Sequence, residues 1–235
     1  QVATCRHGHS FKTLSALNGS RPEYEMYAKM IANRDGSKVY EAITDWDRNL
    51  YDECVELLAG QPDTAVLPQG ELTSGNNTDQ ALKWNFRQWR HFFNARQLVS
   101  LSIIATAIRD LPGPAAEREA LCALFSGTLE FNNLFTSFKG EGTGAVRHMF
   151  SHHILKPERT PLEAHPWGTP QSSGSFSTLF KSRLQRAHEY KAKPADLVND
   201  GTDINRVAGL SKSLAATIAD SWDSFSATTV QAAYI

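Results

Sequence analysis

The strongest constraint on the fold is a pair of apolar stretches with helical spacing that flank Pro112-Gly113-Pro114. The first begins after Asn94, a residue type that caps helix N-termini, and extends to about Leu111. The second runs from about Ala115 to Phe135. Because Pro-Gly-Pro cannot continue a helix, the sequence predicts a helical hairpin that supplies the main core. The expected inward positions are Leu98, Leu101, Ile104, Ala105 and Ile108, followed by Leu121, Leu124, Phe125, Thr128, Leu129, Phe131 and Leu134.

The N-terminal part predicts a β-hairpin and a third helix. Between residues 23 and 43, two aromatic and β-branched runs surround Asp35-Gly36, which is typical of a hairpin turn. Thr44 or Asp45 can cap a helix that extends to about Leu58 and ends before Gly60 and Pro62. Its expected apolar side comprises Trp46, Leu50, Cys54, Leu57 and Leu58. Residues 61–83 are rich in Gly, Asn, Thr and Pro and predict an irregular connector.

Aromatic and basic residues alternate in the segment from Trp84 to Leu98. Trp89 and Phe92, with neighbouring arginines, have the composition of a platform on which nucleic-acid bases stack. Aromatic residues at the start of a helix also form ordinary core, and the sequence leaves both interpretations open. The arginines concerned are Arg87, Arg90 and Arg96.

The least ordinary stretch extends from Asn132 to Trp167 and contains Gly140, Gly142 and Gly144, followed by basic residues. Alternate glycines let a ligand approach backbone amides, and an arginine can donate two hydrogen bonds to a phosphate. The motif lacks the flanking strand and helix of a dinucleotide loop, and no Gly-Lys-Ser/Thr follows it. A mobile surface loop and an anion-contacting loop therefore both remain open. The basic residues that follow are Arg147, His148, His152 and His153.

Beyond this loop, four prolines predict an extended stretch over residues 155–172. Ser173 or Ser175 then begins a helix to about Ala192, followed by helix-like pieces over 208–222 and a terminal strand over 228–235. The predicted fold class is mainly α with a small β-hairpin (α+β), in which residues 1–60, 61–83, 84–193 and 194–235 form successive regions. The outer face of the predicted helix is basic and carries Lys181, Arg183, Arg186, Lys191 and Lys193.

Charge is distributed unevenly along the chain. Residues 139–193 contain nine Lys/Arg against four Glu, a net of +5, whereas the remainder has 15 against 21, a net of −6. A basic half is compatible with a nucleic-acid face, although solvated helix faces also produce such differences. No apolar run reaches the ~18–20 residues of a membrane span, and the first residues do not resemble a signal peptide. We therefore expect no membrane partner.

The three cysteines are scattered, which favours a reducing compartment and hence the cytoplasm. Cys5, His7 and His9 resemble half of a zinc knuckle, but a closed zinc site needs four ligands and no second pair is present. They are weak candidates, and the sequence predicts no metal site. The first residue is not Met and the last residues look like an interrupted strand, so we expect a segment of a longer protein.

Several short segments occur in an order that is typical of one protein family. The most specific is Phe92-Phe93-x-x-Arg96-Gln97-Leu98 before a long apolar helix. The others are Lys38–Ile43, Glu56–Leu58 before a Leu-Pro pair, Trp89, Asn132-Asn133, Arg147–Phe150, Pro161–Glu163 and Pro166-Trp167. Together, over about residues 5–193, they resemble the large adenine-specific DNA methylases that carry an internal zinc-ribbon insertion.

The resemblance implies transfer of a methyl group from S-adenosylmethionine to adenine N6 of a flipped base. Two family motifs are absent from this sequence, however: the catalytic Asp-Pro-Pro-Tyr and the cofactor-binding Phe-x-Gly-x-Gly. The cysteine pairs of the ribbon are reduced to Cys5 with His7 and His9. The chain thus resembles the inserted middle region of a methylase, with DNA and the rest of the methylase as partners and the cofactor bound elsewhere in the parent protein.

Three functions follow as hypotheses. The first is a DNA-contacting, target-recognition region, with Trp89 and Phe92 as stacking residues and no catalytic residue of its own. The second is a helical scaffold that positions the catalytic domain or a partner in a restriction-modification or phage-defence system. The third, the least supported, is a hydrolase that uses His148, His152 or His153 with Glu163. The residues expected to contact DNA are Lys139, Gly140, Gly142, Gly144, Arg147, His148, Lys181, Arg183, Arg186 and Lys191.

Overall fold

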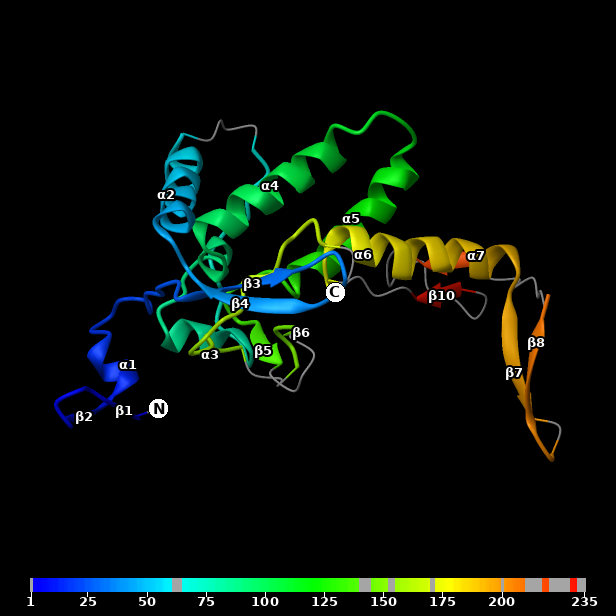
Figure 1. Ribbon diagram of the computed structural model, residues 1–235. Coiled ribbons are helices and arrows are strands. Elements are labelled where there is room, and N and C mark those ends of the chain that lie inside the picture. The colour runs from blue at the N-terminus through cyan, green and yellow to red at the C-terminus, as the bar shows by residue number, and fades with distance from the viewer. Residues whose placement is uncertain are drawn as a thin grey trace. The chain divides into compact units, whose positions relative to one another are not determined.

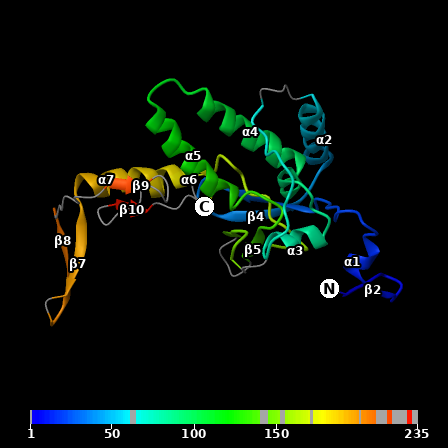
Figure 2. The same ribbon diagram turned by 180° about the vertical axis from the view of Figure 1, so that it is seen from behind.

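The computed structural model describes residues 2–60, 65–139, 145–151, 155–169, 172–199, 201–209, 217–219 and 229–231. Figure 1 and Figure 2 show the chain from opposite sides. It divides into two compact units, residues 1–185 and 186–235, which are described separately below.

The first unit opens with two small antiparallel hairpins. Strands β1 (Val2–Thr4) and β2 (Ser10–Lys12) form one, followed by the short helix α1 (Thr13–Ala16). Strands β3 (Ala28–Ala32) and β4 (Lys38–Ala42) form the other. In its turn, Asp35 Oδ1 accepts a hydrogen bond from Ser37 N at 2.9 Å, and Gly36 has φ +84°, a backbone conformation that glycine adopts without steric cost. The predicted hairpin around Asp35-Gly36 is confirmed.

Helix α2 (Asp45–Ala59) begins after Thr44, as expected. Asp47 Oδ2 accepts hydrogen bonds from Thr44 N at 2.7 Å and from Lys29 Nζ at 2.9 Å, so one carboxylate fixes the helix start and joins it to β3. Cys54 is buried, and α2 packs against α4. The prediction that Trp46 and Leu57 face inward is wrong, since they are 67% and 58% exposed.

The predicted irregular connector contains regular structure. Helix α3 spans Thr78–Lys83. Before it, Leu72 N donates to Arg87 O at 2.8 Å, beside an antiparallel bridge between Glu71 and Gln88. The prediction of an irregular loop over 61–83 is therefore wrong for α3 and for this bridge, while residues 61–64 lie outside the described part.

Helices α4 (Ala95–Arg109) and α5 (Ala115–Leu129) flank the Pro-Gly-Pro break and contact each other. Asn94 caps α4 as predicted, because its Oδ1 accepts from Gln97 N at 2.8 Å. Helix α5 ends at Leu129, earlier than the expected Phe135. The side-chain amides of Asn132 and Asn133 donate to Thr128 O at 2.8 Å and Leu129 O at 2.7 Å, which satisfies the final carbonyls and lets the chain turn.

Buried apolar side chains of the first unit gather in two clusters. The helical cluster lies among α4, α5 and α6, and consists of Ile104, Ile108, Leu124, Phe176 and Leu179. The aromatic cluster is built mainly from segments outside these helices, and consists of Leu72, Ala81, Phe86, Phe92, Leu134, Phe135 and Leu155. Much of the core thus comes from residues 72–92 and 134–155, outside α4 and α5.

The sequence did not predict the strands that flank the glycine-rich stretch. Strands β5 (Ser137–Lys139) and β6 (Ala145–Arg147) pair antiparallel. Ser137 also bridges to Pro161, and Thr136 Oγ1 donates to Leu162 O at 2.8 Å, so the Pro-rich segment lies along β5. Residues 140–144 lie outside the described part.

Ser175 precedes helix α6 (Phe176–Leu179), which confirms the predicted helix start. The π-helical turn η2 (Phe180–Gln185) then ends the first unit. In the second unit, α7 (Arg186–Ala192) is followed by an antiparallel hairpin of β7 (Ala195–Asn199) and β8 (Ile204–Ala208).

Strands β9 (Thr217–Ala219) and β10 (Thr229–Gln231) of the second unit pair in parallel. The helix-like pieces predicted over 208–222 are wrong where the structure describes them, because Thr217–Ala219 is a strand. Strand β10 falls within the predicted terminal strand, whose remaining residues lie outside the described part. The fold is mixed α and β, with strands mostly in small hairpins. Within the described residues, no helix has the length and apolar character that a membrane span requires.

Candidate functional site

The β5–β6 hairpin, called here the basic ribbon, carries two predicted DNA-contacting cations. Its register places Ser137 opposite Arg147, Phe138 opposite Val146 and Lys139 opposite Ala145. Because opposite residues share a face and faces alternate along a strand, Lys139 and Arg147 lie diagonally on one face of the basic ribbon. Both are partly exposed. Their side chains therefore provide positive charge on one side of a narrow two-stranded element.

The other face of the basic ribbon carries Phe138, which contacts Tyr40 of β4. The two rings are perpendicular, with centroids 6.2 Å apart, and are 40% and 60% exposed. Strands β4 and β5 lie side by side in both views (Figure 1, Figure 2). Sequence patterns did not predict this exposed pair. The only signal there was an aromatic residue at a strand position near a lysine in each hairpin, at Lys38-Val39-Tyr40 and Phe138-Lys139.

The predicted stacking platform is wrong for Phe92, whose side chain is 3% exposed. Its ring lies 4.5 Å from Phe135 and 5.9 Å from Phe86, inside the aromatic cluster. Trp89 is 42% exposed and contacts the Phe92 ring from outside, with centroids 5.5 Å apart. The core interpretation therefore applies to Phe92, while Trp89 keeps an accessible edge.

Arg96, another member of the predicted platform, is engaged by Glu163. Its Nε and Nη2 donate to the two carboxylate oxygens at 2.6 and 3.0 Å, and both side chains are 25% exposed. Asn94 Nδ2 also donates to this carboxylate at 2.8 Å, and the guanidinium lies 5.7 Å from the centre of the Tyr51 ring. Hydrogen bonding to Glu163 raises the pKa of Arg96. This ion pair joins α4, α2 and the Pro-rich segment, which is a structural role.

The same ion pair bears on the hydrolase hypothesis, because Glu163 is committed to Arg96 and Asn94. His148 is half-buried, its ring meets Phe131 at a tilt with centroids 5.7 Å apart, and its Nδ1 is buried with no hydrogen-bond partner among the described residues. His148 and Glu163 are therefore not arranged as a catalytic acid–base pair. The predicted contact of His148 with DNA stays a prediction. His152 and His153 lie outside the described residues.

The residues of the predicted basic helix face fall in both units of the chain. Lys181 and Arg183 lie in η2 and are exposed, but residues two apart do not share a helix face. The Arg183 guanidinium approaches Gly127 so closely that an added Cβ there would meet Nη1 at 2.8 Å. Arg186 and Lys191 are exposed on α7, in the second unit. Because the four residues belong to two units, their predicted common face stays a prediction.

The candidate metal ligands lie at the turn of the β1–β2 hairpin. Cys5 Sγ and His9 Nδ1 are 3.6 Å apart, and the His7 and His9 rings are 6.5 Å apart. Among the residues that the structure describes, no group of three or more His, Cys, Asp or Glu side chains converges as metal ligands. Of the other cysteines, Cys122 is exposed, and burial raises the pKa of Cys54.

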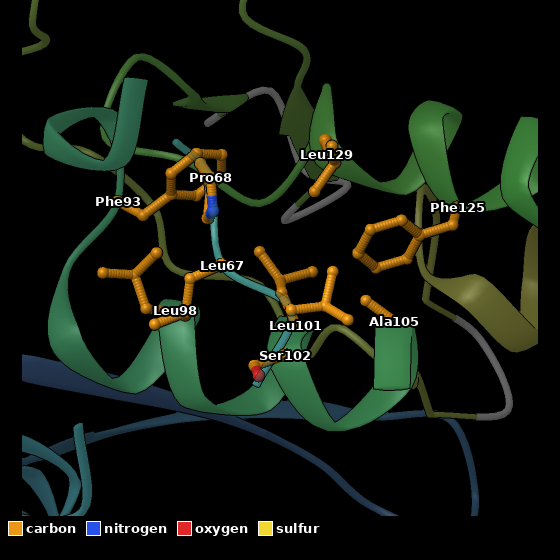
Figure 3. A pocket seen from close by; sticks show the side chains of 10 residues that line it. Leu67, Pro68, Phe93, Leu98, Leu101, Ser102, Ala105, Phe125 and Leu129 are labelled. Carbon is orange, nitrogen blue, oxygen red and sulfur yellow. The ribbon is translucent and has the colours of Figure 1, made fainter. Parts of the chain in front are cut away.

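A cavity of about 240 Å³ lies between α4, α5 and residues 66–68. Figure 3 shows Leu98 and Leu101 of α4 and Phe125 and Leu129 of α5 directed into it. Ser102 is the one polar residue among its described lining, so the cavity offers no convergent charged groups. The cavity is therefore an incompletely packed part of the apolar core between α4 and α5.

Of the predicted DNA-contacting set, the structure thus brings Lys139 and Arg147 together on one face of the basic ribbon, and the half-buried His148 directly follows β6. Gly140, Gly142 and Gly144 lie outside the described residues. No known protein family, curated protein or solved structure matches the chain.

Proposed function

We propose that this chain is a DNA-contacting, target-recognition region of an S-adenosylmethionine-dependent DNA adenine methyltransferase. The observation that supports this proposal best is the basic ribbon, with Lys139 and Arg147 on one face. In the sequence, Gly140, Gly142 and Gly144 stand between its two strands. The DNA major groove admits a two-stranded β-ribbon, and lysine and arginine contacts to phosphates position such an element. In general, glycines let backbone amides approach a phosphate closely.

The methylase identity rests on the sequence resemblance. In the structure, its most specific phrase forms the start of α4, where Phe92 fills the aromatic cluster and Arg96 binds Glu163. Both are structural roles within this chain, whereas the DNA-contacting role rests on the basic ribbon. Because Asp-Pro-Pro-Tyr and Phe-x-Gly-x-Gly do not occur in the sequence, methyl transfer requires residues of the parent protein.

The cofactor part of the proposal is tested by calorimetry on the isolated chain. We expect no binding of S-adenosylmethionine at micromolar concentrations and no transfer of a labelled methyl group to DNA. Binding at micromolar affinity would show that this chain holds its own cofactor site and would end the proposal of a catalytically incomplete region.

The DNA part is tested by titrating a fluorescent duplex with the chain at ~50 mM and ~200 mM salt. We expect binding at the lower concentration and a marked loss at the higher one, because phosphate contacts release counterions. Absence of binding at ~50 mM salt would contradict the DNA-contacting role.

A scaffold in the same type of protein, within a restriction-modification or phage-defence system, is the second candidate. It is favoured by the outer side of α2, where Trp46 and Leu57 are 67% and 58% exposed. They are eleven positions apart, which places them within roughly 20° of one another around the helix. Leu197 and Ile204 of the β7–β8 hairpin are similarly 67% and 69% exposed. Such apolar side chains suit contact with another protein domain.

The two candidates make different predictions for Trp46→Ser combined with Leu57→Ser. If the chain is a scaffold, the double variant should no longer co-purify with the rest of the methylase, and neither wild type nor variant should bind DNA at ~50 mM salt. A DNA-contacting region keeps its duplex affinity in the same variant.

A further inference from the structure

Two hairpins far apart in the sequence bring Tyr40 and Phe138 together at the surface. Tyr40 lies opposite Met30 in the β3–β4 register, and Phe138 lies opposite Val146 in the basic ribbon. The rings are 60% and 40% exposed, although both belong to residue types that usually bury most of their surface. Their paired exposure leaves aromatic surface available for contact with a ligand.

The ring geometry indicates a flat ligand. A perpendicular pair with centroids 6.2 Å apart covers at most one face of one ring, so the other faces remain available to a third ring. Stacking on aromatic side chains is the general way in which proteins hold unpaired bases, and it tolerates any base because every base has a π-face.

The surrounding charge favours a nucleotide over an apolar protein surface. Lys38 shares the face of Tyr40 because it lies two residues earlier on β4, and it is exposed. Lys139 directly follows Phe138 and projects from the opposite face of the basic ribbon. Cations within two residues of both rings suit the phosphates that flank a stacked base, whereas the centre of a protein interface is depleted of lysine.

We infer that the Tyr40–Phe138 pair is a stacking site for an unpaired DNA base. This inference rests on the proposed DNA-contacting function and adds the class of ligand, a base extruded from the duplex or in single-stranded DNA. Contacts of Lys139 and Arg147 with phosphates hold the strand, and the ring pair on the other face of the basic ribbon receives the base.

The probe is a pair of duplexes that contain 2-aminopurine, either opposite thymine or opposite an abasic site. We expect the whole chain to bind the abasic duplex more tightly by roughly 5- to 100-fold, the range that corresponds to one base stacked on an aromatic side chain.

Tyr40→Ala should remove most of this preference and leave affinity for the paired duplex within about twofold, while Tyr40→Phe should retain it because the ring remains. Trp46→Ala is the matched control, since Trp46 is an exposed aromatic residue on α2, outside the ring pair. A melting curve of each variant checks folding, and retention of the preference in Tyr40→Phe excludes a general loss of structure.

The outcomes separate this inference from the proposed function. Equal affinity for both duplexes, with salt-dependent binding intact, overturns the stacking site and leaves the DNA-contacting role in place. An equal loss on both duplexes in Tyr40→Ala also overturns it, because the ring then serves general contact. No binding to either duplex at ~50 mM salt removes the proposed function and the inference with it.

Discussion

The segment from Trp84 to Leu98 and the surface formed by β4 and β5 contain the same kinds of residue and use them differently. In the segment, Phe92 is 3% exposed within the aromatic cluster and Arg96 donates both hydrogen bonds to Glu163. On the β4–β5 surface, Tyr40 and Phe138 are 60% and 40% exposed, and Lys139 and Arg147 share one face of the basic ribbon. Aromatic and basic residues near one another are thus equally suited to hold a fold together and to meet a ligand. What separates the two uses is burial and the presence of an internal carboxylate.

The largest expected effect on stability is in the buried segment from Trp84 to Leu98. Phe92→Ala should lower the free energy of unfolding by about 3–5 kcal/mol, because it removes a ring that contacts Phe86 and Phe135 and leaves a cavity. Phe138→Ala, which removes a partly exposed ring, should cost about 1 kcal/mol. Urea unfolding of both variants measures the two losses in free energy of unfolding. Equal losses would show that Phe138 contributes to stability as much as the buried Phe92.

The next largest loss of stability is expected at the Arg96–Glu163 ion pair. Arg96→Ala should cost about 2–4 kcal/mol, somewhat less than loss of a partner from a fully buried pair, because both side chains are 25% exposed. Arg109→Ala is the matched control on the same helix, since Arg109 pairs with Asp110 at an exposed position and should cost less than about 1 kcal/mol. If Arg96→Ala instead weakens DNA binding without changing stability, the assignment of Arg96 to the framework is wrong.

A smaller effect concerns pH and the start of α2. Hydrogen bonds from the Thr44 backbone and then from Lys29 lower the pKa of Asp47 from 3.8 to about 2. Because the folded state holds the charged form more strongly, this stabilisation is present above pH 4 and is lost as the pH falls toward 2. Asp47→Ala should therefore melt a few degrees below the wild type at neutral pH, and the gap should close over that range. A gap that persists at pH 2 would show that the ionised carboxylate is not its source.

The smallest effect on stability is expected at the basic ribbon. Arg147→Ala should change the free energy of unfolding by less than about 1 kcal/mol, as for an ordinary surface substitution, and weaken duplex binding by about 1–3 kcal/mol. Thermal melting and titration of the same preparation give both values. A melting loss of several kcal/mol with unchanged DNA affinity would make Arg147 a structural residue instead.

Sequence patterns predicted the elements that local chemistry determines. The Asp35-Gly36 turn, the caps at Thr44, Asn94 and Ser175, and the break at Pro112–Pro114 all appear where residue type and spacing placed them. Each depends on hydrogen bonds or backbone preferences within a few residues, which a single sequence records directly.

The predictions that were wrong or missing concern residues whose contact partners are distant in the sequence. Phe92 is buried because Phe135, more than 40 residues later, supplies the ring beside it, and Arg96 is occupied because Glu163 reaches it from the Pro-rich segment. Tyr40 and Phe138 meet across two hairpins, one of which was not predicted. The β5–β6 strands are only three residues long, so alternation was too short to reveal them.

The central claim is that the basic ribbon contacts DNA phosphates through Lys139 and Arg147. The most direct measurement is the slope of log affinity against log salt concentration for wild-type chain, the double variant Lys139→Ala/Arg147→Ala, and Lys12→Ala, an exposed charge on β2. We predict that the double variant lowers the magnitude of the slope by about two units, near 0.9 for each phosphate that the variant no longer neutralises, and that Lys12→Ala leaves it unchanged. An unchanged slope in a folded double variant would contradict the claim.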